Sequence, residues 1–146
     1  TFERESVKLW LELSRCANDL EKIMDGNLRQ EFGQSMSRFD VLSQLERAEN
    51  HTLTIGQLGR QLIASKGNIT GLLSRMEAEG LLVRRQIPND RRSIQVCLTK
   101  KGLSLFQNMA EKHAQWSEQS LASLSIKDFK TLIELLQKAR VSINKT

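Results

Sequence analysis

Basic side chains are concentrated in the middle third of this 146-residue chain. Residues 51–104 hold nine lysines and arginines against three acidic residues, a net charge of +6. The net charge is −3 over residues 1–50 and +2 over residues 105–146, which leaves +5 for the whole chain. This asymmetry is typical of a protein that turns one face to a polyanion, although a solvated basic surface would give the same count. The order of the structural elements is needed to choose between the two.

Residue types that perform covalent or metal chemistry are sparse. His51 and His113 are far apart in sequence, and neither a Ser/His/Asp arrangement nor an H-E-x-x-H motif is present. Cys16 and Cys97 are too isolated to form a disulfide framework or a metal knuckle. We therefore expect no enzyme activity, no metal site and no bound cofactor. The sequence also lacks an apolar run of roughly 18 residues and a secretion signal, so we expect a cytoplasmic protein with no membrane partner.

Apolar periodicity and capping residues predict a mostly helical chain with one β-hairpin. Two short helices separated by a tight turn form a helix-turn-helix, and the hairpin that follows them adds a wing. The predicted elements are helices over residues 7–32 (stopped by Gly33), 37–50 (capped by Ser37), 54–62 (capped by Thr54) and 65–79 (capped by Ser65 and ended by Gly80), a hairpin over residues 81–98, and helices over residues 99–121 (capped by Thr99) and 125–143 (capped by Ser125).

Three segments in this order carry a family resemblance. They are S-K-G-N-I-T-G-L-L-S-R-M-E-A-E-G-L-L-V-R-R (residues 65–85), P-N-D-R-R-S (88–93) and V-C-L-T-K-K-G (96–102). Together they closely resemble the multiple-antibiotic-resistance-regulator (MarR) family. The resemblance implies a dimeric winged helix-turn-helix transcription regulator, usually a repressor whose DNA affinity is altered by small ligands or by oxidation. It also implies a mainly α fold with a small β-hairpin wing.

The resemblance extends to the flanking helices, so we expect one MarR-type domain over residues 1–146. The winged helix-turn-helix DNA-binding lobe would span residues 37–101. Residues 5–33 and 102–144 would form a helical dimerisation lobe, because their apolar stripes exceed what a small domain can bury alone. The residues predicted at the dimer interface are Trp10, Leu13, Leu132, Leu136 and Ile143, with an intramonomer core as the alternative.

The side of the 65–79 helix opposite its apolar stripe carries short polar residues, basic residues and glycines. A helix in the major groove needs such groups, because asparagine can pair with adenine and arginine or lysine with guanine. Ser65, at the start of this helix, could also hold a phosphate. The residues predicted to face DNA from this helix are Ser65, Lys66, Gly67, Asn68, Thr70, Gly71, Ser74 and Arg75. An ordinary solvated helix face is the alternative.

Four arginines surround the predicted wing. In the family, a D-x-R arrangement lets the aspartate, here Asp90, orient an arginine, here Arg92, that enters the minor groove. The narrow minor groove concentrates negative potential, which favours an inserted arginine. Because strand residues alternate faces, only one of Arg84 and Arg85 can point to the duplex. The wing residues assigned to DNA are Arg84, Asp90, Arg91 and Arg92.

The family resemblance also implies an effector that binds between the two lobes, such as an aromatic acid, a phenol or a coenzyme A thioester. Arg38 could pair with its carboxylate, and His113 and Trp116 could stack on it or hydrogen-bond to it. A surface arginine, a core histidine and a packed tryptophan are the alternatives. Some family members sense peroxide through a first-helix cysteine held by tyrosines. This chain has no tyrosine, so we favour a buried, inert thiol at Cys16.

The sequence thus predicts a sequence-specific DNA-binding transcription regulator. It would act as a homodimer on palindromic double-stranded DNA, repress transcription and respond to a small molecule. Two alternatives stay open. One is a redox-sensing regulator that uses Cys16, and the other is a winged-helix module that binds protein rather than DNA.

Overall fold

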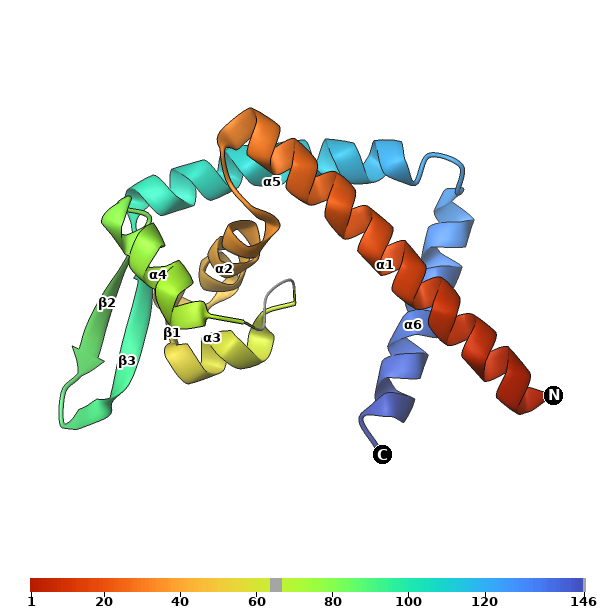
Figure 1. Cartoon of the computed structure of the whole chain (residues 1–146), viewed down its shortest axis with the longest axis horizontal. Coiled ribbons are helices and arrows are strands. Elements are labelled where there is room, and N and C mark those ends of the chain that lie inside the picture. The colour runs from red at the N-terminus through yellow and green to blue at the C-terminus, as the bar shows by residue number, and fades with distance from the viewer. Residues whose placement is uncertain (64–66, 146) are drawn as a thin grey trace. The chain divides into compact units, whose positions relative to one another are not determined.

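The computed structural model describes residues 1–63 and 67–145, with only the backbone of Arg91. The chain divides into two compact units, Thr1–His113 and Ala114–Thr146. The first unit holds α1 (Phe2–Phe32), α2 (Met36–Arg47), the 3-10 turn η1 (Glu49–His51), β1 (Thr52–Thr54), α3 (Ile55–Gln61), α4 (Ile69–Ala78), β2 (Leu82–Ile87), β3 (Asp90–Leu98) and most of α5 (Lys100–Ser120) (Figure 1). The second unit holds the end of α5 and α6 (Ile126–Ile143). The mainly α fold with a small wing is therefore confirmed.

The predicted wing is part of a three-stranded antiparallel sheet with strand order β1-β3-β2. Strands β2 and β3 are joined by Pro88-Asn89, and Asn89 adopts the left-handed conformation (φ 69°) that asparagine tolerates. The hairpin extends away from the helices of its unit (Figure 1). The third strand was not predicted, because β1 has only three residues, of which Leu53 pairs with Val96.

Most predicted helix boundaries are confirmed by the groups that satisfy the end of each helix. Thr54 and Ser125 form capping boxes with Gln57 and Asp128, in which each pair satisfies two backbone N–H groups. The Thr99 hydroxyl accepts from the Gly102 N–H at 3.0 Å and begins α5. Gly33 and Gly80 follow α1 and α4 with φ values of 66° and 78°, as the predicted glycine stops require.

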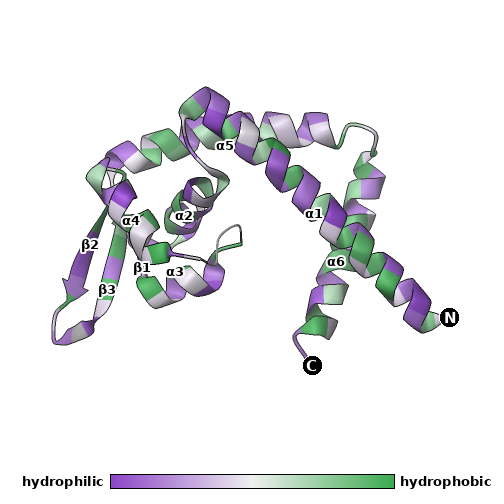
Figure 2. Ribbon diagram, viewed as in Figure 1, coloured by the Kyte–Doolittle hydropathy of each residue, from purple (hydrophilic) through white to green (hydrophobic). Residues whose placement is uncertain are grey.

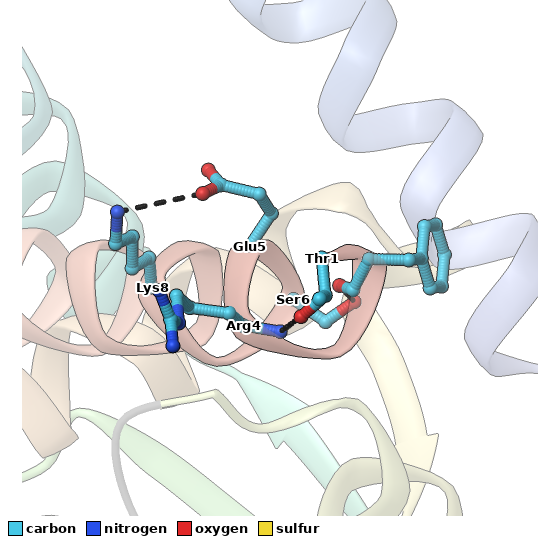
Figure 3. Close-up of polar contacts among 6 residues, drawn as sticks. Thr1, Arg4, Glu5, Ser6 and Lys8 are labelled. Atoms are coloured by element: carbon cyan, nitrogen blue, oxygen red, sulfur yellow. Dashed lines mark hydrogen bonds and ion pairs between the residues drawn. The ribbon is translucent and has the colours of Figure 1, made fainter.

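The starts of three helices differ from the prediction. Helix α1 begins at Phe2 because the Thr1 hydroxyl accepts from the Arg4 N–H at 3.3 Å, and an ion pair between Glu5 and Lys8 supports this first turn (Figure 3). Helix α2 is capped by Ser35 rather than Ser37. Helix α4 is capped by Asn68 rather than Ser65, which lies outside the described residues. Serine and asparagine cap about equally well, so composition alone does not choose between them.

The end of α2 also differs from the prediction. The helix ends at Arg47 rather than near Asn50, and η1 follows it. Asn50 has a φ of 55°, outside the helical region. This turn leads the chain directly into β1.

The buried core of the first unit is formed by side chains from α1 to α5. The side chains that are almost fully buried are Leu28, Val41, Leu42, Leu45, Leu58, Leu62, Leu73, Met76, Leu82, Val96 and Met109. Gly102, at the start of α5, lies so close to the Leu81 carbonyl oxygen that a Cβ there would overlap it. Helix α5 therefore packs directly against the segment that joins α4 to β2.

The second unit has a different character. No residue of α6, all of which the structure describes, is buried. Apolar and polar residues alternate along α6, and along α1 in the first unit (Figure 2). Among the described residues, no helix is long and apolar enough to cross a membrane.

Candidate nucleic-acid interface

Helix α4 has one buried side and one open side. Leu72, Leu73 and Met76 are buried in the core, as the apolar stripe predicts. Thr70 and Arg75, on the predicted DNA-facing side, are exposed. The other predicted residues on this side are Gly67 and Asn68, which are exposed, and Gly71 and Ser74, which are half-buried. Ser65 and Lys66, also predicted to face DNA, lie outside the described residues.

The structure brings Asn68, Gly71 and Arg75 together on the open side of α4. The Asn68 side-chain oxygen accepts from the Gly71 N–H at 2.9 Å, so this asparagine caps the helix. A Cβ at Gly71 would lie 2.6 Å from Asn68 Nδ2 and 3.3 Å from Arg75 Nη1. The glycine therefore leaves room for both polar side chains over the first turns of the helix. A helix start with polar side chains and no bulky apolar side chain suits close approach to a phosphate or a base edge.

Asp90 organises the turn of the wing. Its two carboxylate oxygens accept from the Ser93 hydroxyl at 2.7 Å and from the Arg92 N–H at 3.1 Å. These hydrogen bonds, that from Ser93 first, hold the pKa of Asp90 below its ordinary value. Asp90 thus fixes the backbone at Arg92, whose side chain is exposed at the hairpin tip. Asp90 contacts the backbone of Arg92, and its role in orienting the Arg92 side chain for DNA stays a prediction.

The two arginines of β2 take different roles. The Arg84 guanidinium pairs with Glu77 of α4 at 2.8 Å, and its backbone N–H donates to the other oxygen of the same carboxylate at 3.1 Å. Both contacts, that of the backbone first, lower the pKa of Glu77. Arg85 is exposed. Strand alternation thus turns Arg84 toward α4 and leaves Arg85 in solvent, and the DNA contact predicted for Arg84 stays a prediction.

The acidic residues of the basic segment 51–104 all have partners within the chain. Glu77 binds Arg84, Glu79 binds Arg38, and Asp90 accepts from Ser93 and Arg92. Among the side chains that the structure describes in this segment, the exposed arginines are Arg60, Arg75, Arg85 and Arg92. Arginines neutralise Glu77 and Glu79, whereas the partners of Asp90 are uncharged groups. The exposed arginines therefore outnumber the unneutralised carboxylate, and the excess positive charge is what a phosphate backbone attracts.

Comparison with known proteins places this geometry in a family. A model of the MarR family matches residues 35–94. YkoM, an uncharacterized HTH-type transcriptional regulator of Bacillus subtilis, is 31% identical over 97% of this chain and 92% of its own. BadR, a transcriptional activatory protein of Rhodopseudomonas palustris, is 32% identical over 90% of this chain and 75% of its own. The chain belongs to the MarR family. As a MarR-family protein it is a DNA-binding transcription regulator and not an enzyme.

The MarR fold is also shared with solved structures. Sco3205, a MarR family transcriptional regulator from Streptomyces coelicolor, was crystallised in complex with DNA. Its structure matches this chain with a TM-score of 0.80 at 21% identity, over 93% of this chain and 86% of that one.

The residues that the MarR resemblance assigned to an effector have other contacts within the chain. Arg38 pairs with Glu79 at 2.5 Å, so a ligand carboxylate would have to compete with a carboxylate of the chain itself. The His113 ring is stacked on Phe39, with centroids 4.7 Å apart. Burial lowers the pKa of His113, which favours the neutral ring. Trp116 is half-buried in the second unit. The effector role of Arg38, His113 and Trp116 stays a prediction.

Cys16 is exposed on α1, so the expectation of a buried thiol is wrong. The amphipathic pattern placed it on the apolar side of the helix, but this part of α1 is not covered within the chain. Its basic neighbour Arg15 is paired with Glu12 at 3.7 Å. Within the part of the chain that the structure describes, no group of three or more His, Cys, Asp or Glu side chains could hold a metal ion.

Proposed function

We propose that this MarR-family regulator binds palindromic duplex DNA as a homodimer and represses transcription by occupying its operator. Helix α4 would enter the major groove, and the β2–β3 wing would reach the adjacent minor groove. The observation that carries the proposal is that every acidic residue of segment 51–104 is engaged inside the chain while Arg75 and Arg92 are exposed. Such a surface attracts a polyanion, and the α4 face has the shape and groups for base contact.

The two parts of the surface would make different contributions. The α4 residues Gly67, Asn68, Thr70, Gly71, Ser74 and Arg75, with Ser65 and Lys66 before them, would approach base edges and nearby phosphates. On the wing, Asp90 would hold the backbone so that Arg92 enters the minor groove, with Arg91 and Arg85 near the phosphates. Base contacts give sequence preference, whereas phosphate contacts give affinity that falls steeply with salt.

Uncovered apolar side chains support the homodimer. Trp10 and Leu13 on α1 are exposed in the first unit, and Leu132, Leu136 and Ile143 on α6 are exposed in the second. Exposed apolar patches of this kind on a small domain commonly mark an interface. A two-fold dimer would place two α4 helices about one turn of DNA apart, near 10 base pairs.

The proposal includes control by a small effector, such as an aromatic acid, a phenol or a coenzyme A thioester. Such a ligand can shift DNA affinity only by the difference between its affinities for the DNA-competent state and for the incompetent state. A reporter gene placed behind the selected site would distinguish repression from activation.

Selection from a random pool of duplexes at two salt concentrations tests this function. Wild-type protein is expected to enrich one palindrome. Arg92→Ala should then weaken binding to all duplexes and lower the salt slope by about 1, whereas Arg75→Ala should relax the preference at one position by about 1–3 kcal/mol. Asn68→Ala is a poorer probe, because it also removes the cap of α4.

Lys130→Ala on α6 is the matched control, since it removes one exposed cation outside the proposed DNA surface and on the side of α6 away from Leu132, Leu136 and Ile143. It should leave both affinity and preference unchanged. Uniform recovery of all sequences by the wild type would refute sequence-specific binding. Identical effects of Arg92→Ala and Arg75→Ala would refute the division of roles between the wing and α4.

A further inference from the structure

Three consecutive residues at the start of α2 contact three different elements of the first unit. Arg38 binds Glu79 at the end of α4, Phe39 stacks on α5, and Asp40 binds the segment that follows α3. Successive side chains on a helix are about 100° apart, so a single turn can reach three neighbours. Asp40 contacts Ile63 and Arg38 contacts Glu79. Ile63 and Glu79 are the ends of the segment that carries α4, residues 63–79, called the α4 segment below.

Arg38 holds the C-terminal end of this segment. Its side chain is only 15% exposed, and it pairs with Glu79 at 2.5 Å while it donates to Gln34 at 3.1 Å. Glu79 is the C-cap residue of α4, and its backbone oxygen accepts from the Lys101 ammonium at 2.8 Å. The hydrogen bond from Arg38 lowers the pKa of Glu79, so the carboxylate stays ionised. Removing Glu79 would leave a largely buried cation without this partner, which is costly.

Asp40 holds the N-terminal end of the same segment. It is 5% exposed, and its Oδ2 accepts from the backbone N–H of Ile63 at 2.6 Å. Its Oδ1 accepts from the Gln44 side chain at 3.3 Å. Ile63 directly follows Leu62, the C-cap of α3, so this bond fixes where the chain leaves α3. An alanine at position 40 would leave the Ile63 N–H without this acceptor.

Phe39 ties this arrangement to α5. Its ring is 7% exposed and stacks on Phe106 and His113, with centroids 5.4 and 4.7 Å away. The first turn of α2 is therefore fixed to α5 as well. A short helix of ten residues such as α4 gains a defined direction from contacts of this kind rather than from its own length.

We infer that Arg38 and Asp40 are positioning residues for DNA recognition: they hold the two ends of the α4 segment and so set the direction in which α4 meets the major groove. This inference rests on the proposed function, because it requires that α4 reads DNA. It gives Arg38 a role within the chain that differs from contact with an effector.

A charge exchange between Arg38 and Glu79 tests the inference. Arg38→Glu should reduce affinity for the duplex selected by wild-type protein by about tenfold, with a much smaller change for a scrambled duplex of equal length. Adding Glu79→Arg should restore affinity to within about threefold of the wild type. The fold should tolerate both changes. An acidic residue at position 38 suits the first turn of α2, and a basic residue at position 79 suits the C-terminus of α4, because each charge is favourable toward the helix dipole at that end.

A second pair of variants tests Asp40. Asp40→Asn keeps an oxygen that can accept from Ile63, so it should bind the selected duplex more tightly than Asp40→Ala does. Unfolding midpoints measured on all variants separate a displaced α4 from an unfolded chain. Lys112→Glu is the matched control, because Lys112 pairs with Glu31 at 3.5 Å and links α5 to α1 rather than to α4. It should bind like the wild type.

The outcomes are distinguishable. If the wild type selects no sequence, the proposed function fails and this inference fails with it. If the wild type selects a duplex that Arg38→Glu binds equally well, the positioning role alone is overturned. Loss of affinity that Glu79→Arg does not restore would also overturn it, since the ion pair would then not be the cause.

Discussion

The middle of the chain and its terminal helices use the same amphipathic pattern with opposite results. Helix α2 buries Phe39, Val41, Leu42 and Leu45 within the first unit. Helix α6 has a similar apolar content but leaves Leu132, Leu136 and Ile143 exposed, and the first half of α1 does the same with Trp10. Periodicity therefore shows that a helix has an apolar face, but it does not show which surface covers that face.

The ion pairs also differ between the middle of the chain and the terminal helices. In the middle of the chain, ion pairs join different elements, as Arg38 joins α2 to α4 and Arg84 joins β2 to α4. Near the start of α1, ion pairs such as Glu5 with Lys8 lie within one helix and are highly exposed. Exposed pairs of this kind contribute little to stability. In the middle of the chain, contacts within the chain cover the apolar faces and join the elements. The terminal helices instead have exposed apolar surfaces that another chain could cover.

The largest expected contrast is in the free energy of unfolding, when the same glycine-to-alanine substitution is made at a closely packed site and at an uncovered site. Gly102→Ala should destabilise the protein by about 3 kcal/mol or more, because the new Cβ would overlap the Leu81 carbonyl and lie 2.9 Å from Leu98 Cδ1. Gly26→Ala in α1 meets no atom within 4 Å and should stabilise the helix by about 0.5–1 kcal/mol. Urea unfolding followed by circular dichroism measures both. Equal effects at the two sites would contradict the close packing of α5 on the first unit.

The next largest effect is expected from a charged residue introduced on α6. It should change the association of two chains rather than the fold of each chain. Leu136→Glu should weaken the proposed homodimer by about 2 kcal/mol, because this substitution would place a charge in the apolar stripe that the proposal buries between the two chains. The monomer should keep its helical content, since Leu136 is already 40% exposed in the single chain. Thr131→Glu adds the same charge elsewhere on α6 and should leave the mass by sedimentation equilibrium unchanged. If the Leu136→Glu protein were still fully dimeric, the apolar stripe of α6 would not be part of the dimer interface.

Local features of the fold were predictable from the sequence. The capping boxes at Thr54 and Ser125, the glycine stops and the wing turn depend on residues within a few positions of one another, and their physics is local. The buried stripe of α4 is also local, since Leu72, Leu73 and Met76 fix which side faces the core. The exposure of Thr70 and Arg75 follows from it directly.

The features that were missed depend on distant partners. Strand alternation showed that Arg84 and Arg85 face opposite ways, but only the packing of β2 beside α4 decides that Arg84 meets Glu77. Arg38 lies 41 positions before Glu79, and the sequence has no local signal for their ion pair. Cys16 was expected to be buried because its helix is amphipathic, and the structure leaves that part of α1 uncovered.

His113 offers the smallest and most local test, because it is the last residue of the first unit. Burial lowers the pKa of His113 below the ordinary imidazole value of 6.5, so the folded chain binds fewer protons than the unfolded chain just below that pH. This contribution to stability is complete above pH 6.5 and decreases as the pH falls through the unfolded value. His113→Phe should therefore lose less stability than the wild type between about pH 7.5 and 5.5.

The phenylalanine keeps an aromatic ring against Phe39 at 4.7 Å, so packing is largely preserved in this variant. The carboxylates with lowered pKa values, Asp25, Glu77, Glu79 and Asp90, add their own acid sensitivity only below their ordinary pKa values of 3.8 for aspartate and 4.5 for glutamate. The window above pH 5 therefore isolates the histidine from these groups. Urea midpoints at the two pH values measure the effect, and an equal loss in wild type and variant would mean that α5 is already open to solvent at His113. The part of α5 that is packed against the rest of the first unit would then end before His113.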